Sequence, residues 1–113
     1  MRLPNADRLQ VDREKITDYL LCASHPDGQA KAEFFTRFGF RPEQWEVFAE
    51  ALRKHGGSYS IVKKVESPYG TRYAVDGPLA SPDGRNPRVR SVWMHEPGAG
   101  PRLITAYPLE VPT

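Results

Sequence analysis

Residues 42–65 read PEQWEVFAEALRKHGGSYSIVKKV, and the spacing of the apolar side chains changes within this stretch. In its first half they recur at intervals of three and four residues, which places them on one face of a helix. These residues are Trp45, Phe48, Ala49 and Leu52. Pro42 suits the first turn of this helix, and His55-Gly56-Gly57 is expected to end it. Residues 59–65 alternate in part and are rich in β-branched side chains, which is typical of a strand.

Two further helices are predicted upstream of this stretch. Residues 12–21 carry apolar side chains at helical spacing, with Asp12 well placed as an N-cap. Residues 24–28 interrupt the helical pattern because they contain a proline and a glycine. A helix then restarts at residue 29 and runs to residue 38, where Gly39 follows in the left-handed position that ends many helices. The N-terminal part of the chain is therefore expected to be helical.

Three more strands are predicted downstream, at residues 71–76, 88–95 and 102–107. Turn signals separate the strands at residues 67–70, 81–84 and 97–100. Short connections between consecutive strands imply an antiparallel meander. A chain of 113 residues suits one hydrophobic core. We therefore expect an α+β fold, with three N-terminal helices packed on a four-stranded antiparallel sheet. The single domain would span residues 1–113, with a helical half (1–57) and a sheet half (58–113).

The small excess of basic residues lies in the sheet half. Residues 1–57 carry nine basic and nine acidic side chains, whereas residues 58–113 carry seven and five. Arg85, Arg88 and Arg90 fall within six residues. Such a cluster suits phosphate groups, although a sheet face that exposes arginines to water looks the same in sequence.

Composition also bounds the location of the protein. No stretch approaches the ~18 apolar residues of a membrane span, and the first residues carry no export signal. The lone Cys22 cannot form an internal disulfide. We therefore expect a cytoplasmic protein with no membrane partner.

Two residues near the start of the predicted helix 29–38 are candidates for chemistry. Lys31 lies on an apolar stripe and near a helix N-terminus, whose dipole disfavours a cation, and a bound anion would relieve this conflict. A lysine that reaches water past its apolar stem would give the same pattern. His25, in the loop before this helix, could move protons at neutral pH. A lone histidine in a loop is nevertheless more often structural or simply exposed.

Polar side chains also recur on the last two predicted strands. Alternation places Arg88 and Arg90 on one face of their strand, and it places Thr105 and Tyr107 on one face of the next. If these faces coincide, a polar patch lies on the sheet.

Short motifs follow one another in a fixed order along the chain. They are Leu20-Leu21, His25-Pro26-Asp27-Gly28, Lys31-Ala32-Glu33-Phe34-Phe35, Phe38-Gly39-Phe40, Tyr69-Gly70-Thr71-Arg72-Tyr73, Asp83-Gly84-Arg85, Val89-Arg90-Ser91-Val92-Trp93 and Pro101-Arg102-Leu103-Ile104-Thr105-Ala106-Tyr107. This ordered set covers nearly the whole chain. It resembles a bacterial domain family found as small stand-alone proteins and as the C-terminal tip of contact-dependent inhibition toxins. One departure is Cys22, where toxin-tip members tend to have asparagine.

The resemblance implies a nuclease-like toxin of the broad group that includes barnase, EndoU, colicin tRNases and RelE, which share N-terminal helices packed on an antiparallel sheet. It implies a metal-independent endoribonuclease that needs no cofactor, cleaves tRNA or mRNA, and leaves a 2′,3′-cyclic phosphate. Such a protein would serve a toxin–antitoxin or interbacterial competition system. Its expected partners are RNA and a cognate antitoxin or immunity protein. The alternative is a noncatalytic RNA- or protein-binding module that forms one member of a toxin–antitoxin pair.

Carried over position by position, the catalytic candidates are His25, Lys31, Tyr73, Arg90 and Thr105. On this hypothesis His25 is the acid or base, while Lys31 and Arg90 hold the phosphate. Thr105 and Tyr73 would orient it. The candidates for substrate binding are Tyr69, Arg85, Arg88 and Tyr107. No metal site is expected, because no carboxylate or Cys/His cluster has metal-ligand spacing.

Overall fold

The computed structural model describes residues 1–96 and 98–109. The helices are α1 (Arg13–Lys15), which continues directly into the π-helical turn η2 (Ile16–Leu20), then α2 (Gln29–Arg37) and α3 (Trp45–Ser58). Two 3-10 turns precede helices: η1 (Ala6–Arg8) comes before α1, and η3 (Pro42–Gln44) leads directly into α3. The strands are β1 (Ile61–Ser67), β2 (Gly70–Pro78), β3 (Arg88–His95) and β4 (Arg102–Pro108).

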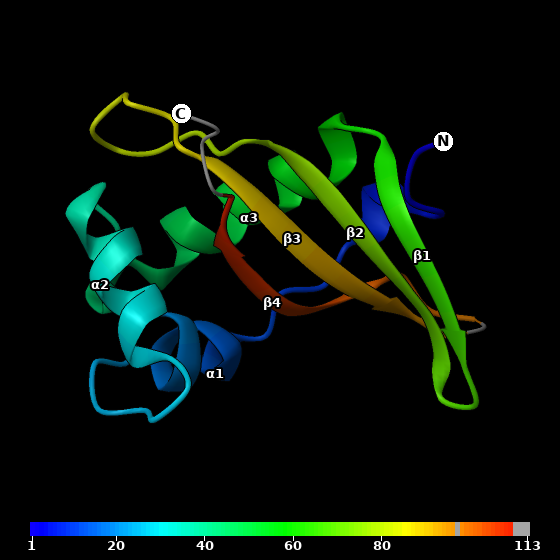
Figure 1. Ribbon diagram of the computed structural model, residues 1–113, viewed down its shortest axis with the longest axis horizontal. Helices are drawn as coiled ribbons and strands as arrows, with labels where there is room; N and C mark the ends of the chain where they lie inside the picture. The colour runs from blue at the N-terminus through cyan, green and yellow to red at the C-terminus, as the bar shows by residue number, and fades with distance from the viewer. Residues whose placement is uncertain (97, 110–113) are drawn as a thin grey trace.

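The four strands form one antiparallel sheet in the order β1-β2-β3-β4 (Figure 1). The expected α+β class, with three helices and a four-stranded meander, is confirmed. A short parallel bridge joins Gln10 to Arg102 of β4. The chain before α1 is therefore attached to the β4 side of the sheet.

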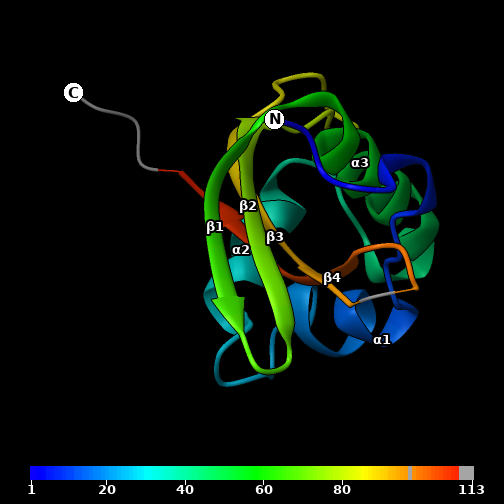
Figure 2. The ribbon, with the colours of Figure 1, turned by 90° about the vertical axis from the view of Figure 1, so that its right-hand side faces the viewer.

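The helices leave one face of the sheet open. In Figure 2 α3 lies on one side of the sheet, and the opposite side carries no helix of the described residues. The core lies between α3 and the sheet and contains Phe48 and Leu52 of α3 together with Val75 of β2 and Trp93 of β3. The first helical segment, made of α1 and η2, and helix α2 lie towards the β4 side of the sheet (Figure 1). We call the face away from α3 the open face.

A buried hydrogen-bond network attaches α3 to β2 and β3. The Nε2 atom of His55 lies 3.0 Å from the carbonyl oxygen of Gly77 and 3.1 Å from that of Val89, so Nε2 carries the proton. Nδ1 then accepts from the hydroxyl of Ser91 at 2.8 Å. The Ser91 oxygen in turn accepts from Nε1 of Trp93 at 2.8 Å. This network fixes which face of the sheet α3 covers, and burial lowers the pKa of His55.

Helix α3 is longer than its sequence suggests. The predicted stop at residues 55–57 is wrong, because α3 continues through both glycines to Ser58. A Cβ atom on Gly56 would lie 2.7 Å from the ring of Trp93. Glycine therefore allows the helix to lie directly against the tryptophan, and this packing overrides the low helix propensity of glycine.

Predictions about single residues at the helix ends and turns are confirmed in some places and not in others. Gly39 does adopt the expected left-handed conformation, with φ 105°. Asp12 makes no capping hydrogen bond and instead forms an ion pair with Arg102 at 3.5 Å. The predicted turn at residues 97–100 includes Pro97, which lies outside the described residues. No helix in residues 1–96 and 98–109 is long and apolar enough to cross a membrane.

Candidate functional site

The open face carries a hollow of about 300 Å³ that we call the sheet hollow. It is lined by Lys63, Val65, Arg72, Ala74, Arg90, Val92, Ile104, Thr105 and Tyr107. These residues come from all four strands. Their side chains share one face because side chains alternate along a strand. Arg90, Thr105 and Tyr107 all line this hollow, so the faces that alternation left open in the sequence do coincide.

A second hollow, of about 420 Å³, lies beside it, and we call it the histidine hollow. It is lined by Lys15, Tyr19, His25, Asp27, Ile104 and Thr105. Ile104 and Thr105 of β4 line both hollows. The first helical segment and the loop that follows it are thereby joined to the open face.

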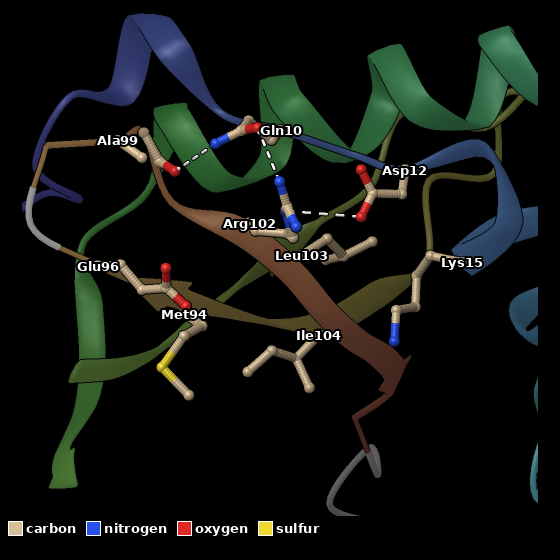
Figure 3. Close-up of a pocket in the computed structure, with 10 residues that line it drawn as sticks. Gln10, Asp12, Lys15, Met94, Glu96, Ala99, Arg102, Leu103 and Ile104 are labelled. Atoms are coloured by element: carbon tan, nitrogen blue, oxygen red, sulfur yellow. Dashed lines mark hydrogen bonds and ion pairs between the residues drawn. The ribbon is translucent and has the colours of Figure 1, made fainter. Parts of the chain in front are cut away.

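A third hollow, of about 270 Å³, lies where the chain before α1 meets β3 and β4 (Figure 3). Arg102 lies between Gln10 and Asp12 there, with Nη2 donating to Oε1 of Gln10 at 3.2 Å. Ile104 lines this hollow too. The three hollows therefore adjoin at Ile104, and together we call them the groove.

His25 is held by the backbone that follows it. Its Nδ1 atom accepts hydrogen bonds from the backbone N–H groups of Asp27 and Gly28, both at 3.0 Å. Nδ1 is thus an acceptor, and the proton lies on Nε2. The imidazole ring packs edge-on against the ring of Tyr19, with centroids 5.0 Å apart.

Gly28 lets this loop approach the first helical segment. A Cβ atom at this position would lie 2.2 Å from the carbonyl oxygen of Tyr19. Any larger residue would therefore push the loop away from Tyr19. The loop conformation that presents His25 depends on this close approach.

Tyr19 lines the histidine hollow and contacts several of its neighbours. Its hydroxyl is 3.1 Å from Oγ of Thr105. The ammonium groups of Lys15 and Lys31 each lie 5.4 Å from the centroid of its ring, within cation–π range. Lys31 also donates to the carbonyl oxygen of Asp27 at 3.2 Å. Lys31 thus fastens the His25 loop to Tyr19 and is not among the residues that line the hollow.

Arg90 is the most firmly held cation of the sheet hollow. Its Nε and Nη2 atoms donate to the two carboxylate oxygens of Asp76 at 2.7 and 2.9 Å. The partners Asp76 and Tyr107 raise the pKa of the Arg90 guanidinium above its ordinary value. The two-point contact fixes the plane of the guanidinium, which remains charged.

Two other cations of the sheet hollow differ from Arg90. Within the part of the chain that the structure describes, neither Lys63 nor Arg72 forms an ion pair with a carboxylate. The rim of the hollow is therefore positively charged, and Asp76 offsets only the charge of Arg90.

The structure brings together four of the nine candidate residues from the sequence: His25, Arg90, Thr105 and Tyr107 line the groove. Tyr73 is a correction. It is only 7% exposed and belongs to the core on the side of α3, because it alternates with the groove residues Arg72 and Ala74. Its hydroxyl cannot orient a ligand on the open face.

Three further candidates also lie apart from the groove. Arg85 donates to the Asp83 carboxylate at 2.6 Å and to the carbonyl oxygen of Arg37 at 2.8 Å, so it fastens the β2–β3 loop to α2. Arg88 is exposed at the first residue of β3 and does not line a groove hollow. Tyr69 is 82% exposed in the β1–β2 turn.

Sequence reasoning alone does not single out the cations Lys15, Lys63 and Arg72 or the phenol of Tyr19, which also line the groove. Tyr19 fits the apolar stripe of the first helix, which favours a core position. The alternation of Lys63 with Val65 and of Arg72 with Ala74 is a usable signal, because it indicates one polar face on each strand. Their meeting across the sheet depends on the strand register, which the sequence does not display.

No group of three or more His, Cys, Asp or Glu side chains in residues 1–96 and 98–109 is arranged to hold a metal ion. The donors that line the sheet hollow and the histidine hollow are mainly cations and hydroxyls, whereas the third hollow also has the carboxylates of Asp12 and Glu96. Cations and hydroxyls bind anions, and phosphate is the commonest biological anion of this kind.

Comparisons with known proteins place the chain in a family. One solved structure with a similar fold is a chain from a contact-dependent growth inhibition toxin–immunity protein complex of Klebsiella pneumoniae 342. The two chains are 23% identical, with a TM-score of 0.73, and the match covers 89% of this chain and 93% of that chain. The search of curated proteins found no match. The model of a family described as a domain of unknown function, DUF6883, matches residues 2–110, and the chain belongs to this family.

Proposed function

We propose that this protein is a metal-independent endoribonuclease toxin and that the groove is its active site. The observation that carries the proposal is the position of Thr105. Its side chain lines both the sheet hollow and the histidine hollow, and its hydroxyl forms a hydrogen bond with Tyr19. A phosphodiester at Thr105 would have His25 on one side and Arg90 on the other. One solved structure with a similar fold is a toxin–immunity protein complex, which supports a role for this chain as one member of such a pair.

The reaction needs few groups. The ribose 2′-oxygen attacks the adjacent phosphorus, the bond from phosphorus to the 5′-oxygen breaks, and the products are a 2′,3′-cyclic phosphate and a 5′-hydroxyl. The 2′-hydroxyl loses its proton to water, which the open groove admits, and the leaving 5′-oxygen takes a proton from water. Negative charge grows on the phosphoryl oxygens during the attack, and fixed donors stabilise it.

The contacts of His25 narrow its role. Because Nδ1 is occupied by two backbone N–H groups, the ring offers a hydrogen-bond donor at Nε2. We assign Nε2 to a phosphoryl oxygen, where a neutral imidazole stabilises the growing charge. Arg90 supplies positive charge from the other side, and its plane is fixed by Asp76. Tyr19 and Thr105 orient the phosphate between them.

The test is cleavage of RNA by purified protein. Wild type is expected to cut total bacterial RNA and leave cyclic phosphate ends, which mass spectrometry detects. His25→Ala should reduce the rate roughly 10²- to 10³-fold, the usual effect of losing one donor to a developing oxyanion. Tyr69→Ala is the matched control, because this exposed residue lies outside the groove. Intact RNA with wild-type protein would reject the proposal, and equal rates for His25→Ala would remove His25 from the site.

A second candidate function is RNA binding without chemistry. It is favoured by Lys63 and Arg72, which form no ion pair within the described residues and would hold phosphate groups whether or not cleavage follows. Expression in bacteria separates the two. A ribonuclease stops growth and degrades RNA, and the double variant His25→Ala, Arg90→Ala does neither. A binding module leaves RNA intact in both strains.

A further inference from the structure

The floor of the sheet hollow is formed by Ala74 and Val92. Lys63, Ala74, Val92 and Thr105 form one row across the four strands in the observed register. The two central members, Ala74 and Val92, are 5% and 9% exposed although no helix of the described residues covers this face. The longer side chains around them therefore form walls, and the floor is apolar and recessed.

The rim of the hollow selects for negative charge. Lys63 and Arg72 stand on the β1–β2 side, and Arg90 and Tyr107 stand at one end. Of these three cations, only Arg90 is paired with a carboxylate of the described residues. A ligand that fills this hollow must combine a flat or apolar part for the floor with an anionic part for the rim.

A nucleotide meets both requirements, because its base has an apolar face and its phosphate is anionic. We propose that the sheet hollow holds one unpaired nucleobase next to the phosphate at Thr105, so that the protein takes single-stranded RNA. This inference rests on the proposed function. Bases inside a duplex are stacked and paired, so their faces cannot reach the floor at Ala74 and Val92.

Binding can be measured without cleavage by using a fluorescently labelled single-stranded DNA oligonucleotide, which lacks the 2′-hydroxyl. Fluorescence anisotropy is expected to show tighter binding to the single strand than to a duplex of the same sequence. Ala74→Leu fills the floor and should weaken binding of the single strand about tenfold, because the base no longer fits against Ala74 and Val92. Ala80→Leu is the control, because Ala80 is exposed and lies outside the groove.

The rim gives an independent variant that leaves the floor unchanged. Lys63→Ala with Arg72→Ala should lower the slope of log K against log salt by about 0.7 for each phosphate that the variant no longer neutralises. Lys64→Ala is the matched control on the same strand, because Lys64 pairs with Tyr73 and points away from the open face. Circular dichroism checks that every variant folds. If the slope of log K against log salt is unchanged for Lys63→Ala with Arg72→Ala, the inference is overturned.

The outcomes separate this inference from the proposed function. If wild type cleaves RNA but Ala74→Leu cleaves and binds as well as wild type, the sheet hollow does not hold a base, whereas the ribonuclease proposal is supported. If no RNA is cleaved but Ala74→Leu still weakens single-strand binding and Lys63→Ala with Arg72→Ala still lowers the salt slope, the sheet hollow binds the base and the ribonuclease proposal fails. Equal affinity of wild type for the single strand and the duplex would also overturn the inference that the sheet hollow holds an unpaired base.

Discussion

Thr105 is the residue on which the proposed site depends most. Its hydroxyl forms a hydrogen bond with the hydroxyl of Tyr19 at 3.1 Å, and its side chain lines both the sheet hollow and the histidine hollow. Thr105→Val keeps the shape of the side chain and removes the hydroxyl. We expect kcat/KM for RNA to fall about tenfold, which corresponds to ~1.4 kcal/mol and to the loss of one neutral hydrogen bond. Single-turnover cleavage measures the effect.

The control for this substitution is Thr36→Val. The Thr36 hydroxyl donates to the carbonyl oxygen of Ala32 at 2.7 Å, within α2 and away from the groove. Both variants lose one hydroxyl, so general effects on stability are comparable. If the two variants cleave RNA at the same rate, Thr105 has no special role in the site.

At this scale the sequence predicts some residues and misses others for physical reasons. His25 and Thr105 stand in motifs whose order resembles a known family, so the sequence alone makes them candidates. Tyr19 is hidden because an amphipathic side chain on a helical stripe is indistinguishable from a core residue until its hydroxyl is seen to bond to β4. Tyr73 is misplaced because a motif does not tell which face of a strand a residue occupies.

Among the elements, α3 carries the sharpest test of packing. Its last turn contains two consecutive glycines, and only Gly56 touches Trp93. Gly56→Ala places a methyl group 2.7 Å from the tryptophan ring, so we expect the free energy of unfolding to fall by about 1–3 kcal/mol, the usual cost of overpacking. Chemical denaturation followed by tryptophan fluorescence measures it.

The neighbouring glycine supplies a matched control with the opposite sign. A Cβ on Gly57 would meet its nearest atom, the carbonyl oxygen of Ala6, at 3.6 Å, which is ordinary contact. Gly57→Ala should therefore gain helix propensity, up to about 1 kcal/mol. Equal destabilisation by both substitutions would mean that the contact of Gly56 with Trp93 does not determine the end of α3.

Periodicity predicts the elements better than their ends. The predicted third strand, residues 88–95, has the same bounds as β3, because a proline-rich turn precedes it and alternation is clear within it. The end of α3 is missed because glycine is a poor helix former, and local propensity cannot report the tertiary contact with Trp93. The first helix is predicted as one run, whereas the structure has a short α-helix followed by a π-helical turn.

For the whole molecule, the two faces of the sheet separate the buried hydrogen-bond network from the proposed site. Alternation along β3 places Ser91 and Trp93 in the buried network on the side of α3 and places Arg90 and Val92 on the open face. The two sets of residues are neighbours in sequence but face opposite sides. Substitutions in the buried network should therefore change stability first, and substitutions in the groove should change binding or cleavage first.

The pH dependence of stability tests the buried network in the intact protein. Burial lowers the pKa of His55 below its ordinary value of 6.5, and the positive charge of Arg88 adds a smaller lowering effect. The unfolded chain therefore binds a proton at His55 at a higher pH than the folded chain does. The contribution of His55 is fully present above its unfolded pKa and is lost as the pH falls through 6.5 towards the lowered folded pKa.

We expect the free energy of unfolding to fall by up to about 1.4 kcal/mol for each pH unit below 6.5, until the folded pKa is reached. Urea denaturation between about pH 5 and pH 8 measures this slope. His55→Phe removes the titrating group; it is less stable at every pH, because the Ser91 hydroxyl and the two carbonyl groups lose a partner. The fall below pH 6.5 should be smaller in this variant by the share that His55 contributes. If wild type and His55→Phe lose stability in parallel over this range, the proton uptake on unfolding belongs to other groups and the His55 network is not the source of the pH dependence.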